Sequence, residues 1–106
     1  MSKPYELRVL EYLKNYLDVA KKVKKLVQSL DPDAKVYVFG SVARGKFTAA
    51  SDIDILVITN KPQLKYEMMV HVYKELEAPI ELHITTPKGF EKWYKRFLKP
   101  EELIEV

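Results

Sequence analysis

The sequence predicts an α/β (α+β) fold in which helices flank a small mixed β-sheet. Segments with apolar residues at three- and four-residue steps alternate with short β-rich runs, and the predicted order is α-β-α-β-α-β-α. Alternation of this kind is typical of helices packed against a sheet. A length of 106 residues, without an internal repeat or a linker, suits a single domain over residues 1–106.

The first predicted element is an amphipathic helix from Pro4 to about Leu30. Its apolar residues recur with helical spacing: Leu10, Leu13, Leu17, Ala20, Val23, Val27 and Leu30. Lysines on the outer face fit a solvated surface. The segment Asp31-Pro32-Asp33 ends the helix and turns the chain, because a residue that precedes proline disfavours the helical conformation.

Three strands and three further helices follow. The strands are predicted where β-branched and aromatic runs are bounded by turn residues, at 35–39, 53–58 and 80–85. The helices are predicted at 41–45, 63–76 and 86–98. In the last of them Thr86 is a suitable N-cap and Pro87 suits the first turn.

The composition excludes several classes of site. With no cysteine, disulfides and thiolate metal sites are excluded. Neither a signal peptide nor an apolar run of membrane-spanning length is found, which predicts a cytoplasmic protein without a membrane partner. The net charge of +3 is spread over interspersed acidic and basic residues. This balance permits an anionic partner but does not predict direct binding to nucleic acid.

Gly40 and Ser41, between a predicted strand and a predicted helix, form a candidate anion site. Free N–H groups at a helix N-terminus bind anions, and glycine lets a phosphate approach the backbone closely. Arg44 follows three residues later on the same helical face, where its guanidinium can bind phosphate oxygens. Taken alone, such a junction fits an ordinary turn and N-cap better than a binding site.

Asp52 and Asp54 form a candidate metal site at the start of the second strand. Side chains two residues apart on a strand share a face, so both carboxylates are expected to point away from the core. Two close carboxylates repel unless a cation lies between them, and Mg²⁺ commonly bridges carboxylates to phosphates. Taken alone, an Asp-x-Asp pair fits two exposed aspartates partnered by lysines better than a metal site.

A third acidic residue is expected on the third strand. Glu81 and His83 share the face opposite the aliphatic residues of that strand. Glu81 can ligate a metal or accept a proton from an attacking hydroxyl. His83 fits a structural role better than one supporting a metal ligand, and His71 is interpreted as structural.

In combination, these features resemble the DNA-polymerase-β-like nucleotidyltransferase superfamily. The resemblance covers nearly the whole chain and rests on Gly40-Ser41, Arg44-Gly45, Asp52-Ile53-Asp54 and Glu81. The Gly-Ser-x-Ala-Arg-Gly form and the short length look most like the minimal nucleotidyltransferases of prokaryotes, which implies the nucleotidyltransferase fold. It also implies that Gly40, Ser41 and Arg44 hold the triphosphate of ATP.

The same resemblance assigns two Mg²⁺ ions to Asp52 and Asp54, with Glu81 in the place of the third acid. That acid is often Asp in the family and assists the attacking hydroxyl. Glu81 departs from the pattern by one methylene, which moves the carboxylate. An NTP-binding subunit that neutralises its partner without turnover therefore remains an alternative.

The resemblance further implies a partner. Minimal nucleotidyltransferases are commonly encoded beside a HEPN-domain RNase, and some act as antitoxins by transferring AMP from ATP to a tyrosine of that toxin. Trp93, Tyr94 and Arg96 of the last helix are available to dock a partner, with burial of Trp93 in the core as the alternative. A small-molecule nucleotidyltransferase, such as those that modify aminoglycosides, and a homo-oligomer are further alternatives.

Overall fold

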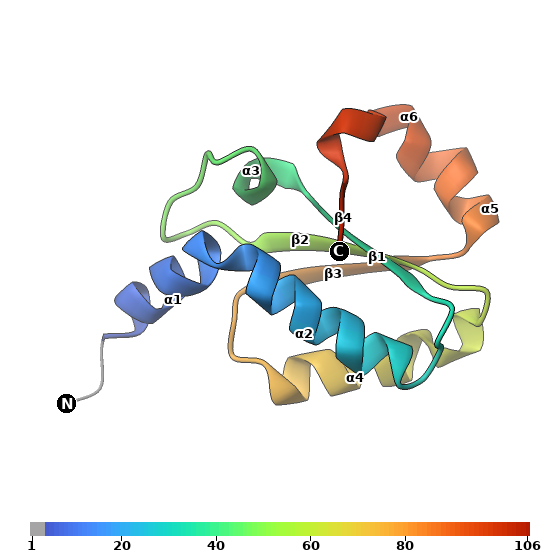
Figure 1. Ribbon diagram of the computed structural model, residues 1–106, viewed down its shortest axis with the longest axis horizontal. Coiled ribbons are helices and arrows are strands. Elements are labelled where there is room, and N and C mark those ends of the chain that lie inside the picture. The colour runs from blue at the N-terminus through green and yellow to red at the C-terminus, as the bar shows by residue number, and fades with distance from the viewer. Residues whose placement is uncertain (1–3) are drawn as a thin grey trace.

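The protein is built around one mixed sheet, as predicted, which has four strands where three were expected. The computed structural model describes residues 4–106. The strands are β1 (Lys35–Phe39), β2 (Ile53–Ile58), β3 (Ile80–Thr85) and β4 (Ile104–Glu105), in the order β3-β2-β1-β4 (Figure 1). β1 pairs antiparallel with β2 and β4, whereas β2 and β3 are parallel. Helix α4 (Lys65–Glu75) connects the parallel pair, as expected for a crossover connection.

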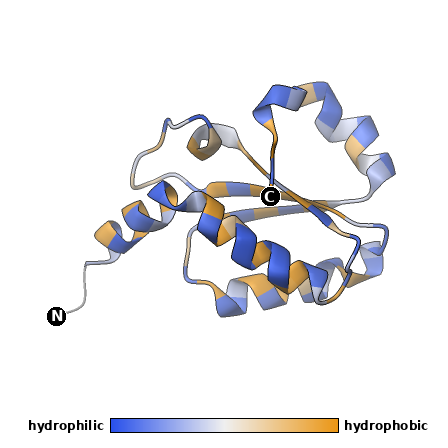
Figure 2. Cartoon of the chain, in the orientation of Figure 1, coloured by the Kyte–Doolittle hydropathy of each residue, from blue (hydrophilic) through white to orange (hydrophobic). Residues whose placement is uncertain are grey.

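Helices cover the two faces of the sheet unequally. Helices α2 (Tyr16–Gln28) and α4 lie on one side, and the C-terminal helical segment lies on the other (Figure 1). That segment consists of α5 (Pro87–Gly89), a π-helical turn (Phe90–Tyr94) and α6 (Lys95–Phe97). In Figure 2, α2 shows a strongly hydrophilic outer surface with hydrophobic residues on the same helix, the pattern of an amphipathic helix.

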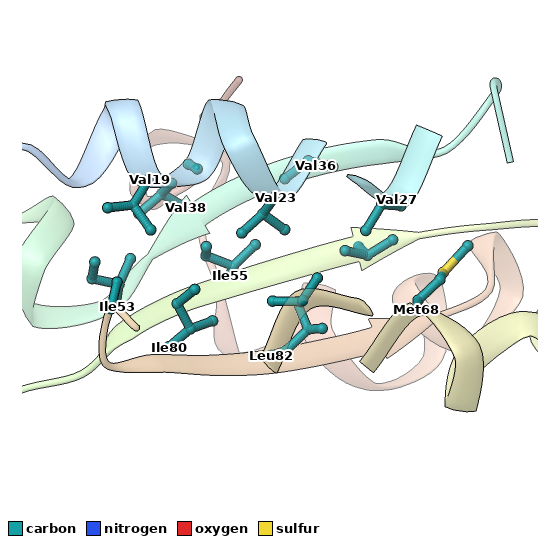
Figure 3. Packing of buried hydrophobic residues seen from close by; sticks show 14 of the residues in the cluster. Val19, Val23, Val27, Val36, Val38, Ile53, Ile55, Met68, Ile80 and Leu82 are labelled. Carbon is teal, nitrogen blue, oxygen red and sulfur yellow. The ribbon is translucent and has the colours of Figure 1, made fainter. Parts of the chain in front are cut away.

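The core lies between the sheet and the α2–α4 layer. Alternate residues of each strand point into it, and the largest contributors from β2 are Ile53 and Ile55, both fully buried. Figure 3 shows these side chains packed with residues of α2, α4 and the neighbouring strands: Val19, Val23, Val27, Val36, Val38, Met68, Ile80 and Leu82. The remaining side chains of the strands face the C-terminal helical segment or solvent.

The predicted helix over 4–30 is two helices, α1 (Tyr5–Lys14) and α2. Asn15 interrupts them with φ −105° and ψ 37°, and its side-chain amide donates to the carbonyl of Glu11 at 2.9 Å. Asparagine competes for backbone groups in this way, which explains why the helix breaks where the apolar spacing continues. Because of the break, α1 extends beyond the edge of the sheet (Figure 1).

The other predicted elements are close to the observed ones. All three predicted strands are confirmed, and Thr86 caps the last helical segment by accepting from the amide of Gly89 at 3.0 Å. The helix predicted at 41–45 is the four-residue α3 (Gly40–Ala43). The helix predicted at 63–76 is α4 preceded by a 3₁₀ turn, Pro62–Leu64. The C-terminal β4, preceded by a 3₁₀ turn (Pro100–Glu102), was not predicted, since two residues carry no strand pattern. Among the described residues, no helix is both long and apolar enough to cross a membrane.

A buried polar pair joins the end of α2 to the end of β2. Thr59 donates its hydroxyl hydrogen bond to Asp31 Oδ2, and Asp31 Oδ1 accepts from the amide of Asp33 at 3.1 Å. Only 2% of Asp31 and 1% of Thr59 are exposed. The acidic turn predicted to end the first helix therefore also holds the sheet to α2.

We expect Thr59→Val to lower the free energy of unfolding by about 1–3 kcal/mol, because it leaves a buried carboxylate oxygen without its donor. Urea unfolding measures this change. Thr48→Val is the matched control: its hydroxyl accepts one exposed hydrogen bond, from the amide of Ala50 at 3.3 Å, so its substitution should cost no more than about 0.5 kcal/mol. Equal losses in the two variants would show that the Asp31–Thr59 pair contributes nothing specific.

A second polar cluster ties α1 to the segment before β3. Arg8 donates to Glu77 Oε1 from Nε at 3.2 Å and from Nη2 at 2.9 Å, and the Tyr12 hydroxyl donates to Oε2 at 2.7 Å. Hydrogen bonds from Arg8 and then Tyr12 lower the pKa of Glu77 below its ordinary value of 4.5. A carboxylate with a lowered pKa stabilises the fold above its unfolded-state pKa, and this contribution is lost as the pH falls through the folded-state pKa.

We therefore expect Glu77→Gln to lower stability at neutral pH and to have a smaller effect at a pH well below 4.5. The side chains of Arg8 and Glu77 are 35% and 44% exposed, so solvent screening keeps the effect small. Thermal unfolding of both proteins as a function of pH measures it. Glu75→Gln, an exposed change on α4, is the control. A difference between wild type and Glu77→Gln that does not vary with pH would contradict the assignment.

Candidate active site

The acidic residues and the Gly-Ser turn meet at one end of the sheet. Asp54 is paired with Phe39 of β1 on one side and with Glu81 of β3 on the other. Gly40 follows Phe39 directly and begins α3, which lies at the end of the sheet where β2 starts (Figure 1). The strand register thus brings the predicted phosphate turn and the predicted metal strand together.

Gly40 of the Gly-Ser turn lies directly against the carboxyl group of Asp54 on β2. Its φ of 83° lies in the region that favours glycine, and a Cβ built on it would overlap Asp54 Oδ2 and lie 3.1 Å from Asp54 Cγ. No other residue type fits between α3 and the Asp54 carboxyl group without movement. The glycine therefore has a steric role toward Asp54 in addition to any role toward a phosphate.

Helix α3 presents Ser41 and Arg44 beside this glycine. Val42 is buried and anchors the helix to the core, whereas Ser41 is half-buried. Arg44 is exposed and ends the helix, and its amide donates to the carbonyls of Gly40 at 3.3 Å and Ser41 at 3.2 Å. Both residues are accessible at the end of the sheet that carries Asp54.

A cluster of possible metal ligands lies on the face of the sheet opposite the core. Asp54, Glu81 and His83 each place one ligand atom within 4.8 Å of the others. His83 Nε2 is 3.7 Å from Asp54 Oδ1 and 3.6 Å from Glu81 Oε1. Glu81 and His83 share this face of β3 because they are two residues apart. Carboxylate oxygens and a histidine nitrogen are a donor set that fits a divalent cation.

The Asp54 carboxyl group is destabilised as an anion in the absence of a cation. Burial raises its pKa most, a hydrogen bond and the charge of Glu81 add to the increase, and His83 lowers it, so that the pKa is about 6. Carboxylates that share a site behave in this way, and a bound cation reverses the effect. The electrostatics therefore favour a positive charge between Asp54 and Glu81.

Asp52 lies outside this cluster. It precedes β2, which begins at Ile53, and its side chain is exposed. β2 begins one residue after Asp52, so the expectation that Asp52 and Asp54 share a strand face stays a prediction. The metal-binding role of Asp52 remains a prediction.

His83 lies closer to the acids than its structural interpretation implied. Its imidazole packs between the rings of Phe39, at 5.2 Å between centroids, and Tyr94, at 6.2 Å. His71, in contrast, is exposed on α4. The signal in the sequence was the spacing of two residues between Glu81 and His83, but only the pairing of β2 with β3 brings Asp54 to them.

Aromatic and basic side chains of the C-terminal helical segment lie near the same face. Trp93 is 63% exposed, so the alternative that it is buried in the core is wrong. Arg96 is exposed as well, and the Tyr94 ring contacts His83. The segment predicted to dock a partner is therefore available at the surface beside the acidic cluster.

A cavity lined by residues of β1, β2 and the C-terminal helical segment is separate from the acids. It has a volume of about 380 Å³ and is lined by Tyr37, Ile58, Asn60 and Phe90, among others. Tyr37 is two residues from Phe39 along β1, so the cavity lies on the acidic face toward the other end of that strand.

Comparison with known proteins agrees with this geometry. The family described as nucleotidyltransferase domain matches residues 20–105. A protein of Haemophilus influenzae named "Probable protein adenylyltransferase MntA" is 34% identical over 59 residues, which cover 54% of this chain and 52% of that protein. The match thus spans about half the length of this relative.

Two solved structures share the fold. A crystal structure of a protein assigned as a nucleotidyltransferase has a TM-score of 0.65 and 27% identity, and the alignment covers 81% of this chain and 95% of that one. A second, from Sulfolobus solfataricus, has a TM-score of 0.62 at 24% identity and covers 99% of this chain and 89% of that one. The Gly-Ser turn, the acids on adjacent strands and the family match over residues 20–105 lead to one conclusion: the chain belongs to the nucleotidyltransferase domain family.

Proposed function

We propose that this protein is a Mg²⁺-dependent adenylyltransferase that transfers AMP from ATP to a hydroxyl group of a partner protein in the cytoplasm, with residues 1–106 acting as one domain. The contact between Gly40 and Asp54 carries this proposal, because it brings a phosphate-binding turn next to carboxylates suited to a metal. The similarity to a protein named as an adenylyltransferase supports AMP as the transferred group and a protein as the acceptor.

Each residue has a distinct role in the proposed reaction. Gly40 and Ser41 bind phosphate oxygens at the start of α3, and the exposed Arg44 guanidinium binds the triphosphate through paired hydrogen bonds. Asp52, Asp54 and Glu81 would hold two Mg²⁺ ions. When bound, these ions supply positive charge at the transferred phosphate and at the departing pyrophosphate.

Proton transfer is assigned to Glu81. The acceptor oxygen forms a bond to the α-phosphorus as the bond from that phosphorus to the β-phosphate oxygen breaks, and pyrophosphate leaves. The proton of the acceptor hydroxyl passes to the Glu81 carboxylate, which is exposed and therefore accessible to an incoming group. In-line attack requires the acceptor to approach from the side of Glu81, opposite the leaving group.

The acceptor is proposed to be a tyrosine of a HEPN-domain toxin, which makes this protein the antitoxin of a toxin–antitoxin pair. The exposed Trp93 and Arg96 beside the acidic face are suited to docking such a partner. Aromatic and arginine side chains of this kind commonly provide most of the binding energy at protein interfaces. A homo-oligomer that presents this surface is compatible with the same reaction.

The test is to incubate the protein with Mg²⁺-ATP and the product of the neighbouring gene and to measure the intact mass of both. A partner that gains the mass of one AMP, with pyrophosphate released, supports the proposal. Glu81→Gln should slow this transfer more than it lowers ATP affinity, since it removes the proton acceptor and weakens one of three metal ligands.

Two outcomes would redirect the proposal. The length of Glu81 favours the alternative of a non-catalytic subunit, and a partner that is bound and inhibited but never modified would support it. Modification of an aminoglycoside or another small alcohol in place of the partner would assign a small-molecule nucleotidyltransferase. In either case the family assignment and the acidic cluster are unaffected.

A further inference from the structure

We propose that His83 is itself a metal ligand, so that Asp54, Glu81 and His83 form a mixed carboxylate–imidazole site that prefers Mn²⁺ to Mg²⁺. The inference rests on the proposed function only in placing a divalent cation at Asp54 and Glu81. It adds a nitrogen donor to a site that sequence reasoning built from carboxylates alone. The argument depends on the distances, the burial and the surroundings of the imidazole.

The distances fit one shared ion. His83 Nε2 lies 3.7 Å from Asp54 Oδ1 and 3.6 Å from Glu81 Oε1. Two donors that each lie about 2.1 Å from one ion can be at most about 4.2 Å apart, so both separations allow a common ion. Both are too long for a hydrogen bond, which needs about 3.2 Å or less. The imidazole therefore lies near both carboxylates but is hydrogen-bonded to neither.

The polar neighbours of His83 Nε2 are Asp54 and Glu81, and neither lies within hydrogen-bond distance. The atom is buried and has no hydrogen-bond partner among residues 4–106. A buried polar atom without a partner is costly and rare in native proteins, and an ion absent from the structure is one of its few explanations. The rings of Phe39 and Tyr94 pack against the imidazole and hold its orientation toward the acids. The orphaned nitrogen is therefore positioned before an ion arrives.

The donor set decides which ion is preferred. Mg²⁺ takes oxygen ligands almost exclusively, whereas imidazole suits transition metals. Replacing one oxygen donor by a histidine nitrogen gains affinity for Mn²⁺ and for later transition metals, but little for Mg²⁺. The site still binds Mg²⁺ through Asp54 and Glu81 when Mn²⁺ is scarce.

Pulsed electron paramagnetic resonance of Mn²⁺ bound to the full chain, without nucleotide, tests the proposal directly. A directly bound imidazole nitrogen couples to the manganese electron spin, and we expect this ¹⁴N signal in the wild-type protein. The chain has two histidines, which provides a matched pair of variants. His83→Asn should lose the imidazole signal, and His71→Asn should keep it, since His71 is exposed on α4.

Affinity measurements give a second readout. We expect His83→Asn to lower the affinity for Mn²⁺ by at least about tenfold and that for Mg²⁺ by less than about threefold. A wild-type protein that binds Mn²⁺ without a ¹⁴N signal would overturn the proposal, and that result does not depend on whether the variant folds. Equal losses for both ions in a folded His83→Asn would overturn it too.

These failures can be told apart from failure of the proposed function. If the ¹⁴N signal is missing while His83→Asn still transfers AMP with Mg²⁺ at the wild-type rate, only the assignment of His83 falls. If neither ion binds to the wild-type chain, with or without ATP, both the ligand role of His83 and the proposed metal-dependent transfer are wrong.

Discussion

Asp54→Asn is expected to reduce nucleotidyl transfer by on the order of 10³-fold or more, the largest effect of any single substitution in this protein. Asp54 is the central member of the acidic cluster, paired with Glu81 in the register and in contact distance of His83. An amide at this position cannot balance the charge of a cation. The rate of pyrophosphate release with a saturating acceptor measures the loss.

Removing Mg²⁺ with a chelator should cause the same loss of transfer activity as Asp54→Asn. The affinity for ATP should fall strongly in both cases. Asp18→Asn, which removes an exposed carboxylate on α2, is the control and should leave both quantities unchanged. Burial and the nearby Glu81 disfavour the charged form of Asp54, so Asp54→Asn should not lower the stability of the fold. Titration calorimetry that finds equal ATP affinity with and without Mg²⁺ would refute a site shared by metal and triphosphate.

Gly40→Ala is expected to abolish ATP binding, the second large effect. The new Cβ would overlap the Asp54 carboxyl group, so either α3 or Asp54 must move. Either movement separates the phosphate turn from the cation ligands, whose contact is the basis of the site. The positive φ of 83° adds backbone strain of about 1–2 kcal/mol to the variant. Calorimetry with Mg²⁺-ATP measures binding, and urea unfolding measures stability.

Gly45→Ala separates the two causes. Gly45 also has a positive φ, 73°, but nothing lies within 4 Å of a Cβ built on it. It should therefore lose about 1–2 kcal/mol of stability from strain alone and keep ATP binding. If both alanine variants bound ATP equally well, the contact between Gly40 and Asp54 would have no functional meaning.

Local pattern in the sequence was sufficient for most of the secondary structure. The bounds of β1, β2 and β3 follow from β-branched runs between turn residues, for example the run Ile53 to Ile58 of β2. The N-cap of Thr86 follows from side-chain chemistry that acts over three residues. Such features depend on neighbours in the chain, and so they can be inferred from it.

Sequence pattern failed where a distant contact or a weak local preference decided the result. The break at Asn15 lies within an uninterrupted apolar repeat, and the burial of Asp31 depends on Thr59, which is 28 residues away. The two-residue β4 exists because β1 provides a partner for Ile104 and Glu105. None of these has a periodic signal of its own.

In the candidate site, too, some features follow from the sequence and others only from the pairing of the strands. The sequence by itself determined the candidate residues, because residue type and spacing single out Gly40, Ser41, Arg44, Asp52, Asp54 and Glu81. The register decided the rest, because the pairing of β2 with β1 and β3 places Asp54 between the Gly40 turn and Glu81. It also adds His83 to the cluster and leaves Asp52 outside the strand. Side-chain periodicity can predict the face of a strand on which a residue lies, but only pairing between strands sets which residues are neighbours across it.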